Sequence, residues 1–242
     1  PAILEGAGYR KPSRVQVHGY VTINGQKMSK SRGTFITARR YADILPTDCL
    51  RYYYAAKLSS QVEDIDLNLE DFMARVNSDL VGKFVNLASR CAGFITKRFE
   101  GTLATQLDDI KLYSEFVSCG TQVQEMYDAL EFNKAIRLIM ALADKANQYI
   151  DQHQPWALMK QEGQQERVHL ICTQGLNMFR VIAVYLSPIL VDMSVSISQF
   201  LNDALLWSTI DRPLLTHKIN RFKPLLQRVT TDDLEELVHV VA

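Results

Sequence analysis

Residues 70–99 read EDFMARVNSDLVGKFVNLASRCAGFITKRF, and this stretch decides the fold. Its apolar residues return mostly at intervals of three or four, which places them on one stripe of a long amphipathic helix. The stripe consists of Phe72, Val76, Leu80, Phe84, Leu87 and Phe94. Gly101 is expected to end the helix. Gly82 and Gly93 lie inside it, where each costs about 1 kcal/mol relative to alanine, so we expect another helix to approach closely there.

The rest of the chain is helical in pattern almost to its end. Further amphipathic helices are predicted over 107–130, 133–151, 164–186 and 189–202. Pro155 ends one helix and suits the first turn of the next. Residues 230–233 predict the start of a short terminal helix that runs through Val238. Helices with short connections predict an antiparallel α-helical bundle over residues 71–242.

The residues before the long helix follow a different pattern. A β-branched run over 15–23 predicts a strand. This strand has no evident partner, so we expect residues 1–33 to be the end of a larger α/β domain. Residues 34–70 form a junction. The predicted fold is mainly α, with a small α/β remnant and a junction in front of the bundle.

Two signals stand out within the junction. Pro46 predicts the start of a helix whose first amides Thr47 or Asp48 would cap. Residues 62–69 alternate apolar and polar side chains, which is typical of a strand. The junction is therefore expected to contain both kinds of element.

The composition is that of an ordinary globular protein, with 47% hydrophobic and 22% charged residues and a formal net charge of zero. No apolar run approaches the roughly 20 residues that a membrane-spanning helix needs, and no secretory signal is visible, so we expect a cytoplasmic protein without a membrane partner. The cysteines lie far apart without a CxxC pair, which favours reduced thiols over a zinc site or a disulfide framework. They are Cys49, Cys91, Cys119 and Cys172.

A basic loop follows the predicted strand. It reads Lys27-Met28-Ser29-Lys30-Ser31 and contains two ammonium groups, two hydroxyls and no carboxylate. Ammonium and hydroxyl groups bind phosphate oxygens in proteins, although most basic runs are simply solvated. The amino-acid sequence of this run resembles the signature loop of class I aminoacyl-tRNA synthetases. The flanking residues 17–21 (VHGYV) and 24–26 (NGQ) are similar to the methionyl-tRNA synthetase version.

This resemblance implies a role for each residue of the loop. In the family the loop closes over ATP and stabilises the pyrophosphate that leaves. Preorganised cations lower the barrier for such a reaction, because negative charge builds on the leaving oxygens. Lys27, Met28, Ser29, Lys30 and Ser31 are therefore expected to bind ATP. Lys30, and after it Lys27, is expected to be catalytic.

A second set of residues resembles the same family. Asn86 and Arg90 are four residues apart, so they share a helix face, and Trp156 follows Pro155. By themselves they read as a solvated polar pair and a packing tryptophan. Together with Asp71-Phe72-x-x-Arg75-x-Asn77-x-Asp79-Leu80 and Asn86-Leu87-Ala88-Ser89-Arg90, they resemble the anticodon-binding domain of methionyl-tRNA synthetases. The resemblance implies that Asn86 and Arg90 hydrogen-bond the first anticodon base, cytosine, and that Trp156 stacks on it.

The motifs occur in family order over essentially the whole chain, which resembles a carboxy-terminal portion of a bacterial methionyl-tRNA synthetase. The parent enzyme is then an ATP-dependent methionine–tRNA ligase with ATP, Mg²⁺, methionine and tRNA(Met) as its ligands. The His-Ile-Gly-His signature of the family does not occur in these 242 residues. We therefore expect the chain alone to be an inactive monomer that holds no cofactor stably. Zinc is expected only in the amino-terminal part of the family's enzymes.

Two other interpretations remain open. The chain could derive from another class I synthetase, such as the cysteinyl or leucyl enzyme. It could instead be a non-catalytic helical module that binds tRNA or protein. Binding to tRNAs with different anticodons distinguishes these possibilities. Neither alternative accounts for Asn86, Arg90 and Trp156 occurring together with the signature loop.

Overall fold

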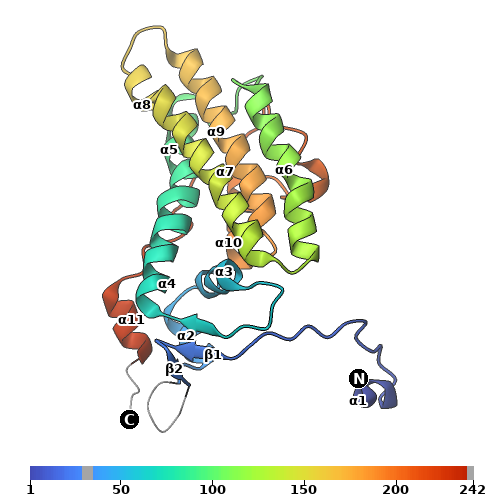
Figure 1. The fold of residues 1–242 in the computed structure, drawn as a ribbon. Helices are drawn as coiled ribbons and strands as arrows, with labels where there is room; N and C mark the ends of the chain where they lie inside the picture. The colour runs from blue at the N-terminus through green and yellow to red at the C-terminus, as the bar shows by residue number, and fades with distance from the viewer. Residues whose placement is uncertain (29–34, 239–242) are drawn as a thin grey trace.

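The computed structural model describes residues 1–28 and 35–238. Its main body is an antiparallel bundle of helices, as predicted (Figure 1). The long helices of the body are α5 (Asn86–Arg98), α6 (Ile110–Asp128), α7 (Phe132–His153), α9 (Gln165–Leu186) and α10 (Val191–Leu201). Along the body α6, α7 and α9 alternate in direction, as short connections between neighbouring helices require.

Helix α9 is the centre of this bundle, with α5, α6 and α7 packed around it. Residues 171–186 are all buried, so this part of the helix has no solvent-facing side, whereas its first residues, Gln165 and Glu166, are exposed. Its polar side chains hold the connecting segments. Thr173 accepts a hydrogen bond from the amide of Ala104 at 2.9 Å, and Asn177 both accepts from the amide of Leu214 at 2.6 Å and donates to its carbonyl at 3.0 Å. Burial of these polar groups is possible because each has a backbone partner.

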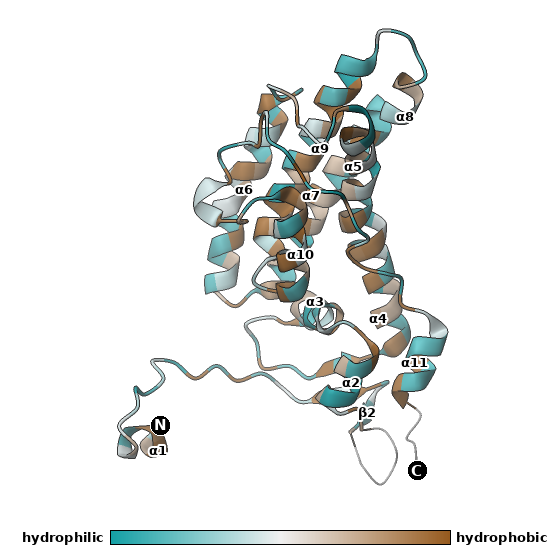
Figure 2. Cartoon of the chain, turned by 180° about the vertical axis from the view of Figure 1, so that it is seen from behind, coloured by the Kyte–Doolittle hydropathy of each residue, from teal (hydrophilic) through white to brown (hydrophobic). Residues whose placement is uncertain are grey.

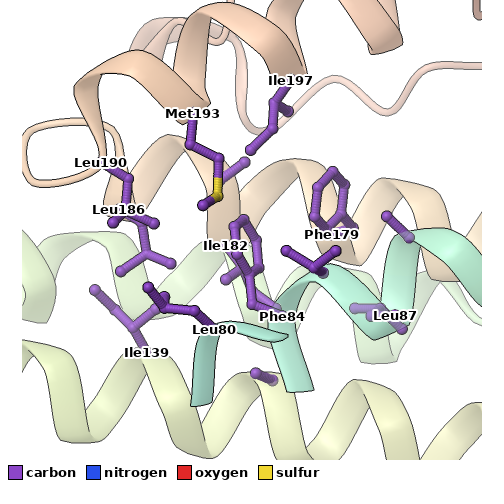
Figure 3. Packing of buried hydrophobic residues seen from close by; sticks show 14 of the residues in the cluster. Leu80, Phe84, Leu87, Ile139, Phe179, Ile182, Leu186, Leu190, Met193 and Ile197 are labelled. Atoms are coloured by element: carbon purple, nitrogen blue, oxygen red, sulfur yellow. The ribbon is translucent and has the colours of Figure 1, made fainter. Parts of the chain in front are cut away.

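The hydrophobic core joins the long helix to α7, α9 and α10. Phe84 stacks on Phe179 of α9 with ring centroids 4.7 Å apart and an angle of 24° between the rings. Figure 3 shows the surrounding side chains pointing toward one another from these elements. They include Leu80, Leu87, Ile139, Ile182, Leu186, Leu190, Met193 and Ile197. In Figure 2 brown and teal stretches alternate along the bundle helices, the pattern of amphipathic elements around a shared core.

The close helix approach that we predicted at Gly82 and Gly93 is wrong. A Cβ atom at Gly93 would meet nothing within 4 Å, and one at Gly82 would approach only the carbonyl of Asn77 in the same helix, at 3.1 Å. The close approach occurs at Gly175 of α9, where a Cβ atom would lie 2.5 Å from Sγ of Cys91. Gly175 is buried on the side of α9 that faces α5, whereas Gly82 and Gly93 are only half-buried.

The long helix has the predicted extent but not a uniform geometry. It consists of α4 (Leu69–Arg75), the π-helical segment η2 (Val76–Val85) and α5. Asn68 caps its start by accepting a hydrogen bond from the amide of Asp71 at 2.8 Å. The carbonyl of Lys83 in the π-helical segment accepts a hydrogen bond from Nδ2 of Asn147 in α7 at 3.1 Å. Segments with i→i+5 bonds are rare and occur frequently at functional sites.

The predicted strand over 15–23 is mostly wrong. Only β1 (Val21–Ile23) is a strand, because Val15 and Val17 are exposed and lie in an extended arm that leaves the body and ends in α1 (Ala2–Gly6) (Figure 1). The expectation that the strand lacks partners is also wrong. It pairs antiparallel with β2 (Gln26–Lys27) and parallel with β3 (Ile65–Leu67), in the order β2-β1-β3.

This small sheet has two local causes. Asn24 and Gly25 both have positive φ, 48° and 73°, which is the backbone of a tight two-residue hairpin between β1 and β2. The alternation over 62–69 predicted a strand, and β3 confirms it. The parallel pairing of β1 with β3 joins strands that are 44 residues apart, Val21 with Ile65, which no local pattern could indicate.

The junction contains α2 (Ala38–Ile44) and α3 (Thr47–Lys57), so the helix predicted after Pro46 is confirmed. Its predicted cap is wrong, since no side chain caps α3. Asp48 is buried and instead accepts hydrogen bonds from the amides of Met193 at 2.7 Å and Asp192 at 3.4 Å in the first turn of α10. Burial raises the pKa of the Asp48 carboxyl, while these hydrogen bonds oppose the rise.

The chain ends by returning to the junction. Helix α11 (Thr231–Val238) begins with the predicted cap, in which Thr230 and Asp233 exchange backbone-to-side-chain hydrogen bonds. At its other end Arg40 of α2 donates to the carbonyls of Leu237, at 2.9 Å, and Glu236. A cation at the carboxyl end of a helix binds carbonyl groups that lack partners within the helix.

All four cysteines are free thiols. Cys49, Cys91 and Cys172 are buried, and Cys119 is half-buried. Across 1–28 and 35–238 there is no grouping of His, Cys, Asp or Glu side chains suited to holding a metal ion. Within the same ranges, none of the helices has the length and apolarity needed to cross a membrane.

Candidate nucleic-acid interface

The structure brings Arg90 and Trp156 together from distant parts of the chain. The guanidinium carbon of Arg90 in α5 lies 4.6 Å from the ring centroid of Trp156, which belongs to the short helix α8 (Pro155–Leu158). Asn86 lies one turn before Arg90 on the same helix. A guanidinium at this distance from an indole face makes a cation–π contact, which fixes both groups.

The chain reversal between α7 and α8 positions Trp156. Gln154 has φ 44° and ψ 59°, a left-handed conformation that ends α7 and lets α8 start at once. Pro155 is buried in the first turn, where its missing N–H has no cost. The side chain of Trp156 remains 39% exposed. The indole is therefore held on one side by the fold and open to solvent on another.

Two residues of α7 hold Arg90 in place. Its guanidinium forms an ion pair with Asp151 and approaches Oδ1 of Asn147 at 3.5 Å. Asn147 is itself fixed, since Nδ2 donates to the carbonyls of Ala143 at 2.9 Å and Lys83 at 3.1 Å. The side chain of Arg90 is only 20% exposed. Its orientation is thus set before any ligand arrives.

Asn86 differs from Arg90 in that no contact fixes its side-chain amide. It is half-buried, and its side-chain amide has no hydrogen-bond partner within the part of the chain that the structure describes. Its carbonyl accepts from the hydroxyl of Ser89 at 3.0 Å. An unpaired amide offers one acceptor and two donor hydrogens to a ligand.

Sequence reasoning missed the polar groups that support this site. They are Asn147 and Asp151, which contact the Arg90 guanidinium. A separate polar cluster joins the nearly buried carboxylate of Asp108 to Arg167 and to the hydroxyl of Tyr149. Nδ1 of His153 lies 2.8 Å from the carbonyl of Tyr149, at the end of α7. Asn147 and Asp151 sit four residues apart on α7, a spacing that could have indicated a shared face opposite Arg90.

Lys27 and Met28, the described residues of the predicted phosphate loop, lie at the other end of the molecule. Figure 1 shows β2, which ends at Lys27, far from α8. Met28 is half-buried and packs against the core. Ser29, Lys30 and Ser31 lie outside the described residues. The structure thus separates the two sets of predicted site residues.

Two family models of known proteins match successive parts of the chain. Residues 1–92 match the model of the class I tRNA synthetases of the methionine type, and residues 100–235 match the model of the anticodon-binding domain of methionyl tRNA ligase. The chain is similar in fold to part of Mycobacterium tuberculosis methionyl-tRNA synthetase. Its complex with methionyl-adenylate superposes with a TM-score of 0.80 at 24% identity, and its apo form with 0.79 at 21%.

These superpositions cover 93% and 95% of this chain but 46% of each synthetase chain, so the chain spans less than half the length of those structures. The second family model alone covers more than half of the 242 residues. The chain therefore belongs to the methionyl-tRNA synthetase family, whose anticodon-binding domain it carries.

Proposed function

We propose that the helical body binds the anticodon loop of tRNA(Met), and that Asn86, Arg90 and Trp156 receive its first base, cytosine. The main support is the contact between Arg90 and Trp156, 4.6 Å from guanidinium to ring centroid, next to the unpaired amide of Asn86. RNA is read most specifically where an unstacked loop base lies on an aromatic plane and hydrogen-bonds along its edge.

The chemistry of cytosine suits these three side chains. Its O2 and N3 atoms accept hydrogen bonds, and Arg90 and Asn86 both carry N–H donors. The exposed part of the Trp156 indole provides a stacking surface, which is worth about 1–3 kcal/mol per base. Because Asp151 and Asn147 already hold the guanidinium, little side-chain freedom is lost when the base binds.

We further propose that Lys27, Met28, Ser29, Lys30 and Ser31 contribute to ATP binding in a complete enzyme that joins methionine to tRNA(Met) with ATP and Mg²⁺. Lys30 and Lys27 would stabilise the negative charge of the leaving pyrophosphate. On this proposal residues 1–33 end the catalytic domain, 34–70 form the stem-contact junction and 71–242 are the anticodon-binding domain. The 242 residues by themselves would not make methionyl-adenylate.

The decisive experiment replaces Trp156 by alanine and measures binding of an RNA hairpin that carries the methionine anticodon. We expect the dissociation constant to rise at least tenfold at fixed salt, because about 1.4 kcal/mol of stacking is lost. Trp156→Phe keeps an aromatic plane and should recover most of the affinity. Val195→Ala, at a position 58% exposed on α10, serves as the matched surface control.

A second RNA makes the test specific to the first base. The wild-type chain should bind a hairpin whose cytosine is replaced by another base at least tenfold more weakly. Trp156→Ala should discriminate much less between the two RNAs. Equal binding of both hairpins by the wild-type chain would contradict the assignment. A folded chain that binds no tRNA at all would favour a protein-interaction module.

A further inference from the structure

A surface groove runs beside the end of α10 and has no role in the function proposed above. It has a volume of about 310 Å³, and its lining includes none of Asn86, Arg90 and Trp156. Helix α10 forms one wall. The other wall is the irregular segment 220–225, which leads toward α11. We call this feature the α10 groove.

The segment 221–228 is anchored at both ends, and its backbone is free in between. At one end the backbone N–H and Nδ2 of Asn220 donate to two carbonyls in the last turn of α10, at 2.9 and 2.6 Å. At the other end the side chain of Asn77 holds both backbone groups of Val229, at 2.8 and 2.9 Å. Between these anchors no backbone N–H or C=O group has a hydrogen-bond partner within residues 1–28 and 35–238. Free backbone groups on an exposed segment are a template for pairing with another extended chain.

Side chains at the start of this segment alternate between solvent and core. Arg221 and Lys223 are exposed. Phe222 between them is half-buried and packs edge-on against Phe200 of α10, with ring centroids 5.0 Å apart and an angle of 78° between the rings. Such alternation is that of a strand with one face on a core, and it places both cations on the solvent side. The segment thus presents a strand-like edge beside a helix.

The α10 groove combines an apolar floor with a basic rim. Phe200, Pro224 and Leu225 contribute apolar surface, and no carboxylate belongs to the lining. Arg221 and Lys223 contribute two positive charges, and neither forms an ion pair in the part of the chain that the structure describes. The ring of Phe200 is only 4% exposed, so it offers an unpaired base no face to stack on. The groove therefore suits an acidic peptide better than single-stranded RNA.

We propose that the α10 groove binds an extended acidic peptide of a partner protein. The peptide pairs with the backbone of residues 221–223 as an added strand, which gives partners to groups that are free in this chain. Its acidic side chains, at every second position, face Arg221 and Lys223. The residues between them are apolar and lie over Phe200 and Leu225. This interaction is independent of the proposed binding of RNA.

The test measures binding of a fluorescein-labelled Glu-Val-Glu-Val-Glu peptide by fluorescence anisotropy. The wild-type chain should bind it saturably and should not bind Lys-Val-Lys-Val-Lys. The double variant Arg221→Gln and Lys223→Gln should bind the acidic peptide about tenfold more weakly, because two ion pairs at the rim are lost. The matched control changes two exposed cations elsewhere, Lys111→Gln and Arg137→Gln, and should bind like wild type. Both double variants should melt at the wild-type temperature, since the altered side chains are exposed.

N-methylated peptides test the strand pairing. In a paired strand only every second N–H group points toward the neighbouring strand. One peptide is therefore methylated at its Val amides and another at its Glu amides, which leaves the charge of both unchanged. One of the two should lose at least tenfold in affinity, and the other should bind like the unmodified peptide. Equal affinities of the two methylated peptides would overturn the proposal, because charge alone would then account for binding.

Other occupants of the α10 groove would give different results. Loss of affinity for the methionine anticodon hairpin in the variant with Arg221→Gln and Lys223→Gln, with peptide binding unchanged, would assign the groove to RNA. Self-association of the wild-type chain that this variant abolishes, measured by sedimentation equilibrium, would assign it to a second copy. Either result would overturn the proposal, and so would a wild-type chain without saturable binding of the acidic peptide.

Discussion

Asp48 illustrates how much a single buried side chain contributes to this fold. It lies at the start of α3, but its carboxylate caps the first turn of α10, which is 144 residues further along the chain. The two amides that it accepts from have no partners within α10, because the first amides of a helix never do. Removing the carboxylate would leave buried donors unsatisfied, which costs more than the hydrogen bonds themselves contribute.

We therefore predict that Asp48→Ala lowers the free energy of unfolding by about 1–3 kcal/mol. Asp48→Asn keeps an oxygen acceptor and should lose clearly less. Urea denaturation followed by circular dichroism measures both. Asp43→Ala is the matched control, since Asp43 is exposed and pairs only with Arg39 on the surface. A loss for Asp48→Ala no greater than for Asp43→Ala would show that the cap contributes nothing.

At the scale of elements, α3 connects the small sheet to the long helix. Tyr53 donates a hydrogen bond to Asp71 of α4 at 3.0 Å, and Lys57 forms an ion pair with the same carboxylate at 2.9 Å. Tyr52 donates to Asp79 of the π-helical segment at 2.9 Å. Desolvation would raise the pKa of Asp71, but the contacts from Lys57 and Tyr53 outweigh it and hold the pKa below its usual 3.8.

The lowered pKa of Asp71 predicts a pH-dependent stability. A carboxyl whose pKa is lower in the folded state contributes stability above its unfolded pKa, and this contribution is lost as the pH falls through the folded pKa. Asp71→Asn should thus be less stable than wild type at neutral pH, and the difference should narrow below about pH 4. Chemical denaturation over a pH series checks this. A difference that does not change with pH would show that the charge is irrelevant.

At the scale of the whole molecule, the two proposed sites lie at opposite ends of one rod-like body. Lys27 belongs to β2 of the small sheet, and the proposed anticodon surface lies around α5 and α8 (Figure 1). Asn86 and Arg90 lie on the long helix, 17 and 21 residues after its start at Leu69, which is roughly 25–30 Å along its axis. Because of this separation, each proposed site should be testable by itself.

We accordingly predict that the purified chain binds the anticodon hairpin but does not catalyse exchange between ATP and pyrophosphate in the presence of methionine. Lys27 lies in β2, an edge strand of the small sheet, and the 242 residues contain no His-Ile-Gly-His sequence. A methionyl-tRNA synthetase with both halves of its active site is the positive control. Exchange above the buffer rate that disappears in Lys30→Ala would contradict the prediction.

Much of this molecule could be predicted from local patterns. Apolar periodicity placed the long helices within a few residues, because the bundle buries at least one stripe of each. The alternation of apolar and polar residues around Ile65 correctly predicted strand β3, and the cap at Thr230 correctly predicted the start of α11. The missing partner of β1 could not be predicted correctly, because its parallel strand β3 is more than 40 residues away and pairing across that distance has no local signature.

Only some residues of the candidate site could be predicted from the sequence. Asn86, Arg90 and Trp156 were indicated by their resemblance to a family, whereas Asn147 and Asp151, which hold Arg90, were not. Gly93 was expected to mark a packed contact, and the fold left it facing open space.

The sequence by itself determined which segments are helical, since helix formation depends on neighbours three and four residues away. Only the tertiary structure decided which side chains meet, because the contacts of Asp48 with α10, of Arg90 with Trp156 and of β1 with β3 all join residues that are far apart in the chain. Such contacts form only when the buried faces of several elements pack together.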